Sequence, residues 1–220
     1  QIFLITLLML LLAAPAGAKK RQAKKGSKRA KATMAQAASL RLELIDTSLR
    51  AIPFGQDADG VMTWIEGRVG QTFEPRFAAA LDARERDTLK HRMRTEMSEI
   101  RQKMVTFDGQ ITGFEASVVQ GEFAVKAEEA LLLFRDNGVD HYLFFSGGRL
   151  WKYARPLAPS LDFALRSEAW VRDQGQPSQR VANEAIHWEG LDYVLRLENR
   201  RLVSASDLLV LEMRKAKAAV

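Results

Sequence analysis

The sequence has no cysteine among its 220 residues. This absence excludes disulfides, zinc sites built on thiolates, a thiol nucleophile and a lipidated cysteine behind an apolar leader. Histidine is scarce as well, and His91, His141 and His187 are too scattered to give metal-ligand spacing. Disulfide-free proteins are common among exported bacterial proteins, so the lack of cysteine is compatible with export.

Sequence motifs for catalysis and cofactor binding are also lacking. The chain has no P-loop, no G-x-G-x-x-G, no H-E-x-x-H, no G-x-S-x-G and no S-x-x-K. We therefore expect no cofactor, and no residue receives a catalytic role from a motif.

Acidic side chains are missing from residues 19–31, which hold eight of the 33 Lys and Arg residues. Elsewhere 25 basic residues stand against 27 acidic ones, so the net charge of +6 comes from this run. A folded nucleic-acid-binding surface would instead carry its basic residues on the domain. Nucleic acid is therefore not the expected partner.

A long apolar run is lacking too, because residues 2–14 are fewer than the ~20 that a bilayer-spanning helix needs. The run is followed by Pro-Ala-Gly-Ala, and an apolar stretch ending in small residues is typical of a signal peptide. We expect residues 1–18 to be a cleaved signal peptide. A short uncleaved anchor is the alternative, because basic residues directly behind a cleavage site hinder translocation. The protein is then periplasmic or secreted, or membrane-associated through this segment.

Residues 19–38 are rich in Lys and Ala and have too little apolar surface to fold, which predicts a disordered basic linker. The linker is either a solvated spacer or a tether to anionic lipid or anionic cell-wall polymer. The tether residues would be Lys19, Lys20, Arg21, Lys24, Lys25, Lys28, Arg29 and Lys31. One domain is expected at residues 39–213, followed by a basic, alanine-rich tail at 214–220.

Residues 131–153 are the densest apolar and aromatic stretch, and they contain two hairpin signals, Asn137-Gly138 and Gly147-Gly148. Two-residue loops fix the pairing of three strands. The expected pairs are Arg135 with Asp140, Leu133 with Tyr142, Leu131 with Phe144, Phe144 with Trp151, and Tyr142 with Tyr153. One face would then carry Leu131, Leu133, Tyr142, Phe144, Trp151 and Tyr153, and the other Leu132, Phe134, His141, Leu143, Phe145, Leu150 and Lys152. The aromatic side chains Tyr142, Phe144, Trp151 and Tyr153 form either hydrophobic core, if covered, or a binding face, if exposed.

Three helices are expected. Asp57 or Asp59 caps a first helix, in which Val61, Trp64 and Ile65 form an apolar stripe. A longer amphipathic helix of up to about 30 residues should follow Pro75, with Glu85 interrupting its apolar face. A third helix should begin at a Ser160 cap and stop at Gly175.

Further strands are expected from alternating apolar residues. They cover residues 40–44, about 111–118 and 122–126 (with Val118 opposite Phe123), 185–188, 191–197 and 208–213. Together these elements predict an α+β fold, in which one long amphipathic helix and two shorter helices pack on a mostly antiparallel β-meander sheet.

One segment is similar to a calcium-binding loop. Asp57, Asp59 and Glu66 match the spacing of oxygen ligands in an EF-hand, and Gly60 falls at its sharp turn. The first ligand position, however, is Gly55, and an aspartate pair that caps a helix explains the same residues. Calcium therefore remains a weak candidate, and no other metal site is indicated.

Two groups of polar residues suggest acid–base chemistry. Asp140, His141 and Ser146 are near one another in the sequence, but strand neighbours point to opposite faces, so Asp140 cannot orient His141 as a triad requires. The other group is Glu115, Glu122, Glu128 and Glu129. Such carboxylates usually form the solvated face of an antiparallel sheet.

Three stretches resemble exported, periplasmic proteins of the myxobacterial type: IPFG at 52–55, FDGQITGFEASVVQGEF at 107–123 and HYLFFSGGRLWKYAR at 141–155. The resemblance covers most of residues 39–213. That family has no established activity, so the likeness implies export and architecture and transfers no site residue.

The sequence favours a non-enzymatic interaction or scaffolding module of the cell envelope. Its partner would be an envelope protein, anionic lipid or cell-wall polymer. The alternative is a small-ligand-binding protein or hydrolase with a pocket at the aromatic meander.

Overall fold

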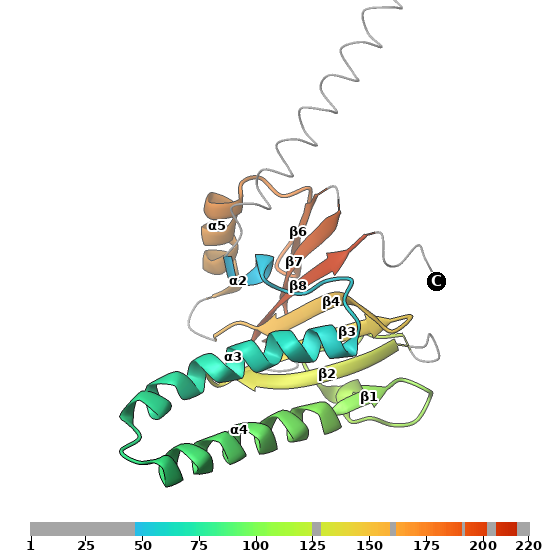
Figure 1. Ribbon diagram of the computed structural model, residues 1–220. Coiled ribbons are helices and arrows are strands. Elements are labelled where there is room, and N and C mark those ends of the chain that lie inside the picture. The colour runs from blue at the N-terminus through green and yellow to red at the C-terminus, as the bar shows by residue number, and fades with distance from the viewer. Residues whose placement is uncertain (1–46, 125–128, 159–161, 191, 202–205, 215–220) are drawn as a thin grey trace, which may run out of the picture. The chain divides into compact units, whose positions relative to one another are not determined.

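The computed structural model describes residues 47–124, 129–158, 162–190, 192–201 and 206–214, all within one structural unit (Figure 1). The predicted signal peptide, basic linker, strand at 40–44 and most of the C-terminal tail lie outside the described residues. For them the predictions above stand as made.

The centre of the fold is an eight-stranded antiparallel sheet, with the strand order β1-β2-β3-β4-β8-β7-β6-β5. Its strands are β1 (Met104–Thr106), β2 (Glu129–Asp136), β3 (Val139–Ser146), β4 (Arg149–Pro156), β5 (Gln179–Val181), β6 (Ala185–Glu189), β7 (Tyr193–Asn199) and β8 (Asp207–Met213). The expected α+β class with a meander-like antiparallel sheet is confirmed. Both edge strands have only three residues, which limits the open hydrogen-bonding edge.

Helices cover one face of this sheet (Figure 1). They are α3 (Ala58–Ala79), α4 (Ala83–Gln102), α5 (Phe163–Gln174) and the four-residue α2 (Thr47–Arg50). Buried side chains of all four, such as Leu49, Val61, Ile100 and Phe163, join those of the sheet in the larger hydrophobic core. Burial of this apolar surface is what holds the helices to the sheet.

The first long helix begins as expected but runs further. Asp57 caps α3 by accepting a hydrogen bond from the Gly60 backbone N–H at 3.0 Å. Val61, Ile65 and Val69 then repeat at four-residue spacing and face the core. Pro75 was expected to separate two helices, and this was wrong, because α3 continues through it to Ala79.

The break falls instead at residues 80–82. Asp82 caps α4 by accepting from the Glu85 N–H at 2.8 Å, and the Glu85 carboxylate accepts from the Leu81 N–H at 2.9 Å. This pair is a variant of the capping box, in which Glu85 accepts from the residue before the N-cap and not from the N-cap itself. Glu85 therefore does not interrupt an apolar helix face, as the sequence suggested, but starts a new helix.

The first of the two expected hairpins is confirmed in its full register. Arg135 pairs with Asp140, Leu133 with Tyr142 and Leu131 with Phe144. Asn137 and Gly138 both have positive φ, as the tight turn requires.

In the second hairpin a β-bulge shifts the register between Phe144 and Phe145. Phe144 therefore pairs with Lys152, and Leu143 pairs with Tyr153. The expected pairs of Phe144 with Trp151 and of Tyr142 with Tyr153 were wrong. Lys152 and Tyr153 consequently exchange the faces that a regular strand would give them.

Residues 107–124, here called the cap segment, cover the second face of the sheet at strands β2, β3, β4 and β8. The strands expected at 111–118 and 122–126, with Val118 opposite Phe123, were wrong where the structure describes them. The segment contains only a short 3₁₀ helix, η1 (Phe114–Ala116), between loops. Its apolar side chains, Phe107, Val118 and Val119, are buried in a second, smaller core.

The remaining elements agree closely with expectation. β6, β7 and β8 match the late strands, while the short β5 was not foreseen. The expected cap at Ser160 was wrong, because Asp162 caps α5 by accepting a hydrogen bond from the Ala164 N–H. Gly175 ends the helix, as expected, with positive φ.

Candidate functional site

The aromatic set proposed as a binding face is core. Tyr142, Phe144 and Trp151 are 6, 0 and 2% exposed beneath the cap segment. Tyr153 is 2% exposed and, because of the bulge, packs on the helix side of the sheet. The cover on the first three is a loop segment and not a helix.

The calcium candidates are spread along one helix. Asp57 is the N-cap of α3, Asp59 forms an exposed ion pair with Arg101 at 2.9 Å, and Glu66 is exposed further along the helix. Nine residues of helix separate Asp57 from Glu66, a rise of about 13 Å. They therefore do not surround a common point, and among the described residues no group of three or more acidic or His side chains could hold a metal ion.

Asp140 and His141 lie on opposite faces of β3, as expected. Asp140 forms a bidentate pair with Arg135 at 2.7 and 2.9 Å. His141 is buried, stacks on Phe134 with ring centroids 4.7 Å apart, and its Nδ1 lies 2.8 Å from the Tyr153 hydroxyl. Ser146 is at the far end of the strand, so it cannot act with His141.

Acidification should reveal the burial of His141. Burial, reinforced by Arg68 and Arg155 and opposed by Asp136 and Asp140, lowers the pKa of His141 from 6.5 to about 4. Between pH 6.5 and 4, His141 is therefore protonated in the unfolded chain but neutral in the folded protein. The free energy of unfolding is highest above pH 6.5 and falls as the pH drops toward 4. We expect a loss on the order of 2 kcal/mol between pH 6.5 and 5.

The control is His141→Gln, which removes this titration but keeps a polar partner for the Tyr153 hydroxyl. Urea unfolding at pH 7, 6 and 5 measures the effect. The variant should lose clearly less stability over that interval, even though His187, whose pKa is also lowered by burial and then by Arg196, still titrates. Equal losses in both proteins would contradict the assignment.

The carboxylates expected on a solvated face are mostly structural. Glu115 accepts hydrogen bonds from the Thr112 N–H and hydroxyl, which, led by the backbone bond, lower its pKa. Glu129 is 7% exposed and accepts from the Ala124 N–H at 2.7 Å. Glu122 is 4% exposed, so the expected solvated face was wrong for both Glu122 and Glu129. Glu128 lies outside the described residues.

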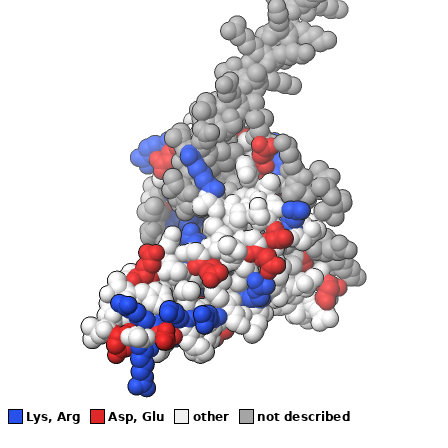
Figure 2. Space-filling view, in the orientation of Figure 1, with Lys and Arg blue, Asp and Glu red and all other residues white. Residues whose placement is uncertain are grey.

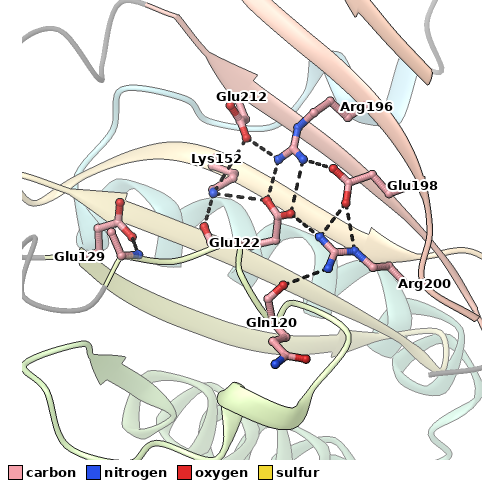
Figure 3. A network of polar contacts seen from close by, with 9 residues as sticks. Gln120, Glu122, Glu129, Lys152, Arg196, Glu198, Arg200 and Glu212 are labelled. Atoms are coloured by element: carbon pink, nitrogen blue, oxygen red, sulfur yellow. Dashed lines mark hydrogen bonds and ion pairs between the residues drawn. The ribbon is translucent and has the colours of Figure 1, made fainter. Parts of the chain in front are cut away.

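Glu122 is the centre of a buried ion network (Figure 3). Its carboxylate lies 2.6 Å from the Arg196 guanidinium, 2.8 Å from that of Arg200 and 3.4 Å from Lys152 Nζ. Lys152 Nζ also donates to the Glu122 backbone carbonyl. One residue of the cap segment is thus bound to side chains of β4, of β7 and of the residue after β7.

Two more carboxylates complete the network (Figure 3). Glu212 on β8 lies 2.5 Å from Arg196, and Glu198 on β7 lies 2.6 Å from Arg200. With Glu122, Lys152, Arg196 and Arg200 this gives three negative and three positive groups. Within the network, charge is therefore balanced.

The pKa shifts in the network follow from competition between burial and neighbouring charge. Burial raises the pKa of Glu122, but Arg196, Lys152 and Arg200 outweigh it, and the net pKa lies below the usual value. Burial dominates at Lys152 and lowers its pKa although Glu122 and Glu212 oppose it. The side chains of Glu122 and Lys152 are only 3 and 6% exposed, so the centre of the network is buried between the cap segment and the sheet.

A more accessible group of charges lies where α3, α4 and the β2–β3 turn meet. We call it the arginine cleft. Its walls are Arg68, Thr72 and Arg76 of α3, Glu96 of α4, and Arg135, Asp136 and Asn137 at the turn, and its floor includes Val69, Phe73 and Phe134. It has a volume of about 210 Å³.

Two shallow grooves flank α4. One lies between α3 and α4, has a volume of about 540 Å³ and is lined by Met62, Met93 and Met97 with charged residues around them. The other has a volume of about 560 Å³ and lies between α4 and Arg135, with His91, Glu99 and Lys103 in its walls.

No protein-family model, curated protein or solved structure matches the chain. Within the described residues, every helix is too short or too polar to cross a membrane. The resemblance to exported proteins therefore remains a prediction, and the function has to be inferred from the surfaces described above.

Proposed function

We propose that the protein is an exported interaction or scaffolding module of the cell envelope, without catalytic activity, and that the α3–α4 hairpin is its contact surface. The observation that carries this proposal is the exposure of α4. Of its 20 residues only Leu89 and Ile100 are buried. Figure 2 shows Lys, Arg, Asp and Glu side chains gathered over this part of the molecule.

The composition of α4 supports binding of a protein partner. Half of its residues are charged, with both signs present, so its surface favours a complementary charged surface. Met93 and Met97 are half-buried in the groove between α3 and α4, where their flexible side chains can adapt to an apolar contact. Helices commonly bind partners through such a combination of charge and adaptable apolar residues.

The envelope part of the proposal is supported by the sequence. An apolar leader followed by a basic linker is compatible with export and with a tether to an anionic surface. The expected partner of the hairpin is an envelope protein, with the linker supplying only proximity to lipid or polymer.

Charge reversal on α4 should remove the partner without harming the fold. Arg92 and Arg94 are exposed, so Arg92→Glu with Arg94→Glu should leave the melting temperature within a few degrees. A photo-crosslinker at the exposed position of Thr95, combined with envelope extract, should give a discrete adduct in the wild type and at least tenfold less in this variant.

The matched control reverses Arg172 on α5 and Arg180 on β5, which are also exposed. α5 lies away from α4 (Figure 1), and β5 is the sheet edge opposite β1. The control should retain the adduct, because it leaves the proposed contact surface on α4 unchanged. Its net charge changes by the same amount as that of the α4 variant, so the comparison separates position from total charge. Loss of the adduct in both double variants would show non-specific charge attraction, and unchanged adduct in the α4 variant would exclude the hairpin.

A second candidate function is binding of a small ligand. The aromatic meander cannot supply its pocket, because those side chains are packed in the two cores. The arginine cleft is the observation that favours it.

A further inference from the structure

The guanidinium groups of Arg68, Arg76 and Arg135 in the arginine cleft are held in place by contacts within the protein. Arg135 donates two hydrogen bonds to Asp140, at 2.7 and 2.9 Å. Arg68 lies over the Trp64 ring at 5.3 Å and donates to Asp136 from both Nε and Nη2. Arg76 lies over the Phe73 ring at 5.2 Å. Side chains fixed in this way lose little conformational freedom when they bind a further group.

Each of these arginines keeps N–H donors to spare. A guanidinium has five N–H donors. Arg68 and Arg135 use Nε and Nη2 on Asp136 and Asp140, and Arg76 has no hydrogen-bond or carboxylate partner among the described residues.

The acceptors of the cleft, by contrast, are largely used. Asp136 is 9% exposed, and its two oxygens accept from Arg68 and from the Asn137 amide. Only Glu96, on the α4 side, presents a carboxylate without a partner among the described residues. The groups of the cleft that are available to a ligand are therefore mainly the positively charged N–H donors of the arginines.

The size of the cleft limits the ligand. Sites for drug-sized molecules have volumes of about 300–1,000 Å³, and the cleft, at about 210 Å³, is smaller. We propose that the arginine cleft binds a phosphate group, either as free phosphate or as the headgroup of an anionic phospholipid. Arginine forks match the oxygens of phosphate, and the aromatic floor keeps Arg76 in the cleft. This proposal does not depend on the α3–α4 hairpin binding a protein partner.

Titration calorimetry with inorganic phosphate, at an ionic strength kept constant with chloride, tests the site. We expect saturable binding to the wild type and a dissociation constant about tenfold higher for Arg76→Gln, because one charge-assisted donor is lost. Arg76 is exposed, and its contact with the Phe73 ring is the one interaction it makes with the described part of the chain, so this variant should fold normally. Arg172→Gln on α5 removes the same charge elsewhere and should bind as the wild type does.

A second variant is expected to change the dissociation constant for phosphate in the opposite direction. Glu96→Gln removes the carboxylate of the cleft that has no partner among the described residues, and it should lower the dissociation constant for phosphate. Absence of binding to the wild type, or equal affinity in Arg76→Gln and Arg172→Gln, would overturn the proposal.

Vesicles distinguish the two sources of phosphate. Sedimentation with phosphatidic acid in phosphatidylcholine, compared with phosphatidylcholine alone, measures headgroup binding, and the difference between wild type and Arg76→Gln cancels any contribution of the basic linker. A difference between the two proteins supports the headgroup. Phosphate binding without such a difference supports free phosphate as the ligand.

Discussion

Replacing Trp151 with alanine is expected to lower the free energy of unfolding by about 3–5 kcal/mol. Trp151 is the extra residue of the β-bulge, is 2% exposed, and packs between the sheet and the cap segment with Phe144 and Val119. Its ring also lies 4.5 Å from Lys152 Nζ, so its loss removes a cation–π contact within a buried site. Truncation of Trp151 therefore leaves a large cavity and removes a contact that stabilises the buried ammonium group of Lys152.

Urea unfolding of the wild type and the variant measures this loss. Trp151→Phe keeps an aromatic ring and should cost less than half as much, which separates lost volume from a general intolerance of the position. A loss below about 1 kcal/mol in Trp151→Ala would mean that the cap segment leaves this face open in solution, and the aromatic side chains would again be candidates for a binding face.

The hairpin of β2 and β3 could be predicted in full because its information is local. Asn137-Gly138 fixes a two-residue turn, and the turn fixes every pair along both strands. The next hairpin has an equally clear turn at Gly147-Gly148, but its register changes at the bulge beside Trp151. This bulge is stabilised by the packing of both faces of the sheet, so no residue type in the sequence predicts it.

The helix boundaries show how a strong rule can mislead. Proline usually ends a helix because it lacks an N–H and its ring crowds the preceding turn. Pro75 is exposed and near the C-terminal end of α3, and the helix continues for only four residues beyond it. The capping box of Asp82 and Glu85 was present in the sequence and gives the true boundary.

The candidate sites were harder to predict than the fold. The network draws on distant parts of the sequence, at Lys152, Arg196 and Glu212. In the sequence, each of these residues looks like a solvent-facing position of a strand that alternates polar and apolar residues. They come together only because β4, β8 and β7 are neighbours in the sheet. The arginine cleft likewise needs α3, α4 and a turn that lies about 60 residues further along the chain.

The ion network joins the cap segment to the sheet through charged side chains, beside the apolar contacts of the smaller core and the hydrogen bond from the Ala124 N–H to Glu129. The cap segment contributes Glu122, whose loss leaves Lys152, Arg196 and Arg200 close together with too little negative charge. Removing one partner of a buried ion pair costs about 3–5 kcal/mol, since the remaining charge stays desolvated. We expect a loss of that size for Glu122→Gln.

Lys152→Met should cost less than Glu122→Gln, because Glu122 retains both arginines and the Met side chain fills the space of the lysine stem. The double variant should cost less than the two single losses added together, by 1 kcal/mol or more, since the two residues interact directly. Urea unfolding of the four proteins gives this coupling energy. A value near zero would mean that Lys152 and Glu122 stabilise the fold independently.

Acid provides an independent measure of the same attachment. The pKa of Glu122 in the folded protein lies below its ordinary value of 4.5, because the three cations outweigh the effect of burial. The stabilisation is therefore complete above pH 4.5 and is lost as the pH falls through the lower, folded-state pKa. Protection factors of the amide hydrogens within residues 107–124, which compare the observed exchange with the intrinsic rate at the same pH, should fall below pH 4.5 in the wild type, whereas in Glu122→Gln they should already be low at pH 7. Slow exchange of this segment in Glu122→Gln at neutral pH would show that its apolar side chains alone hold the cap on the sheet.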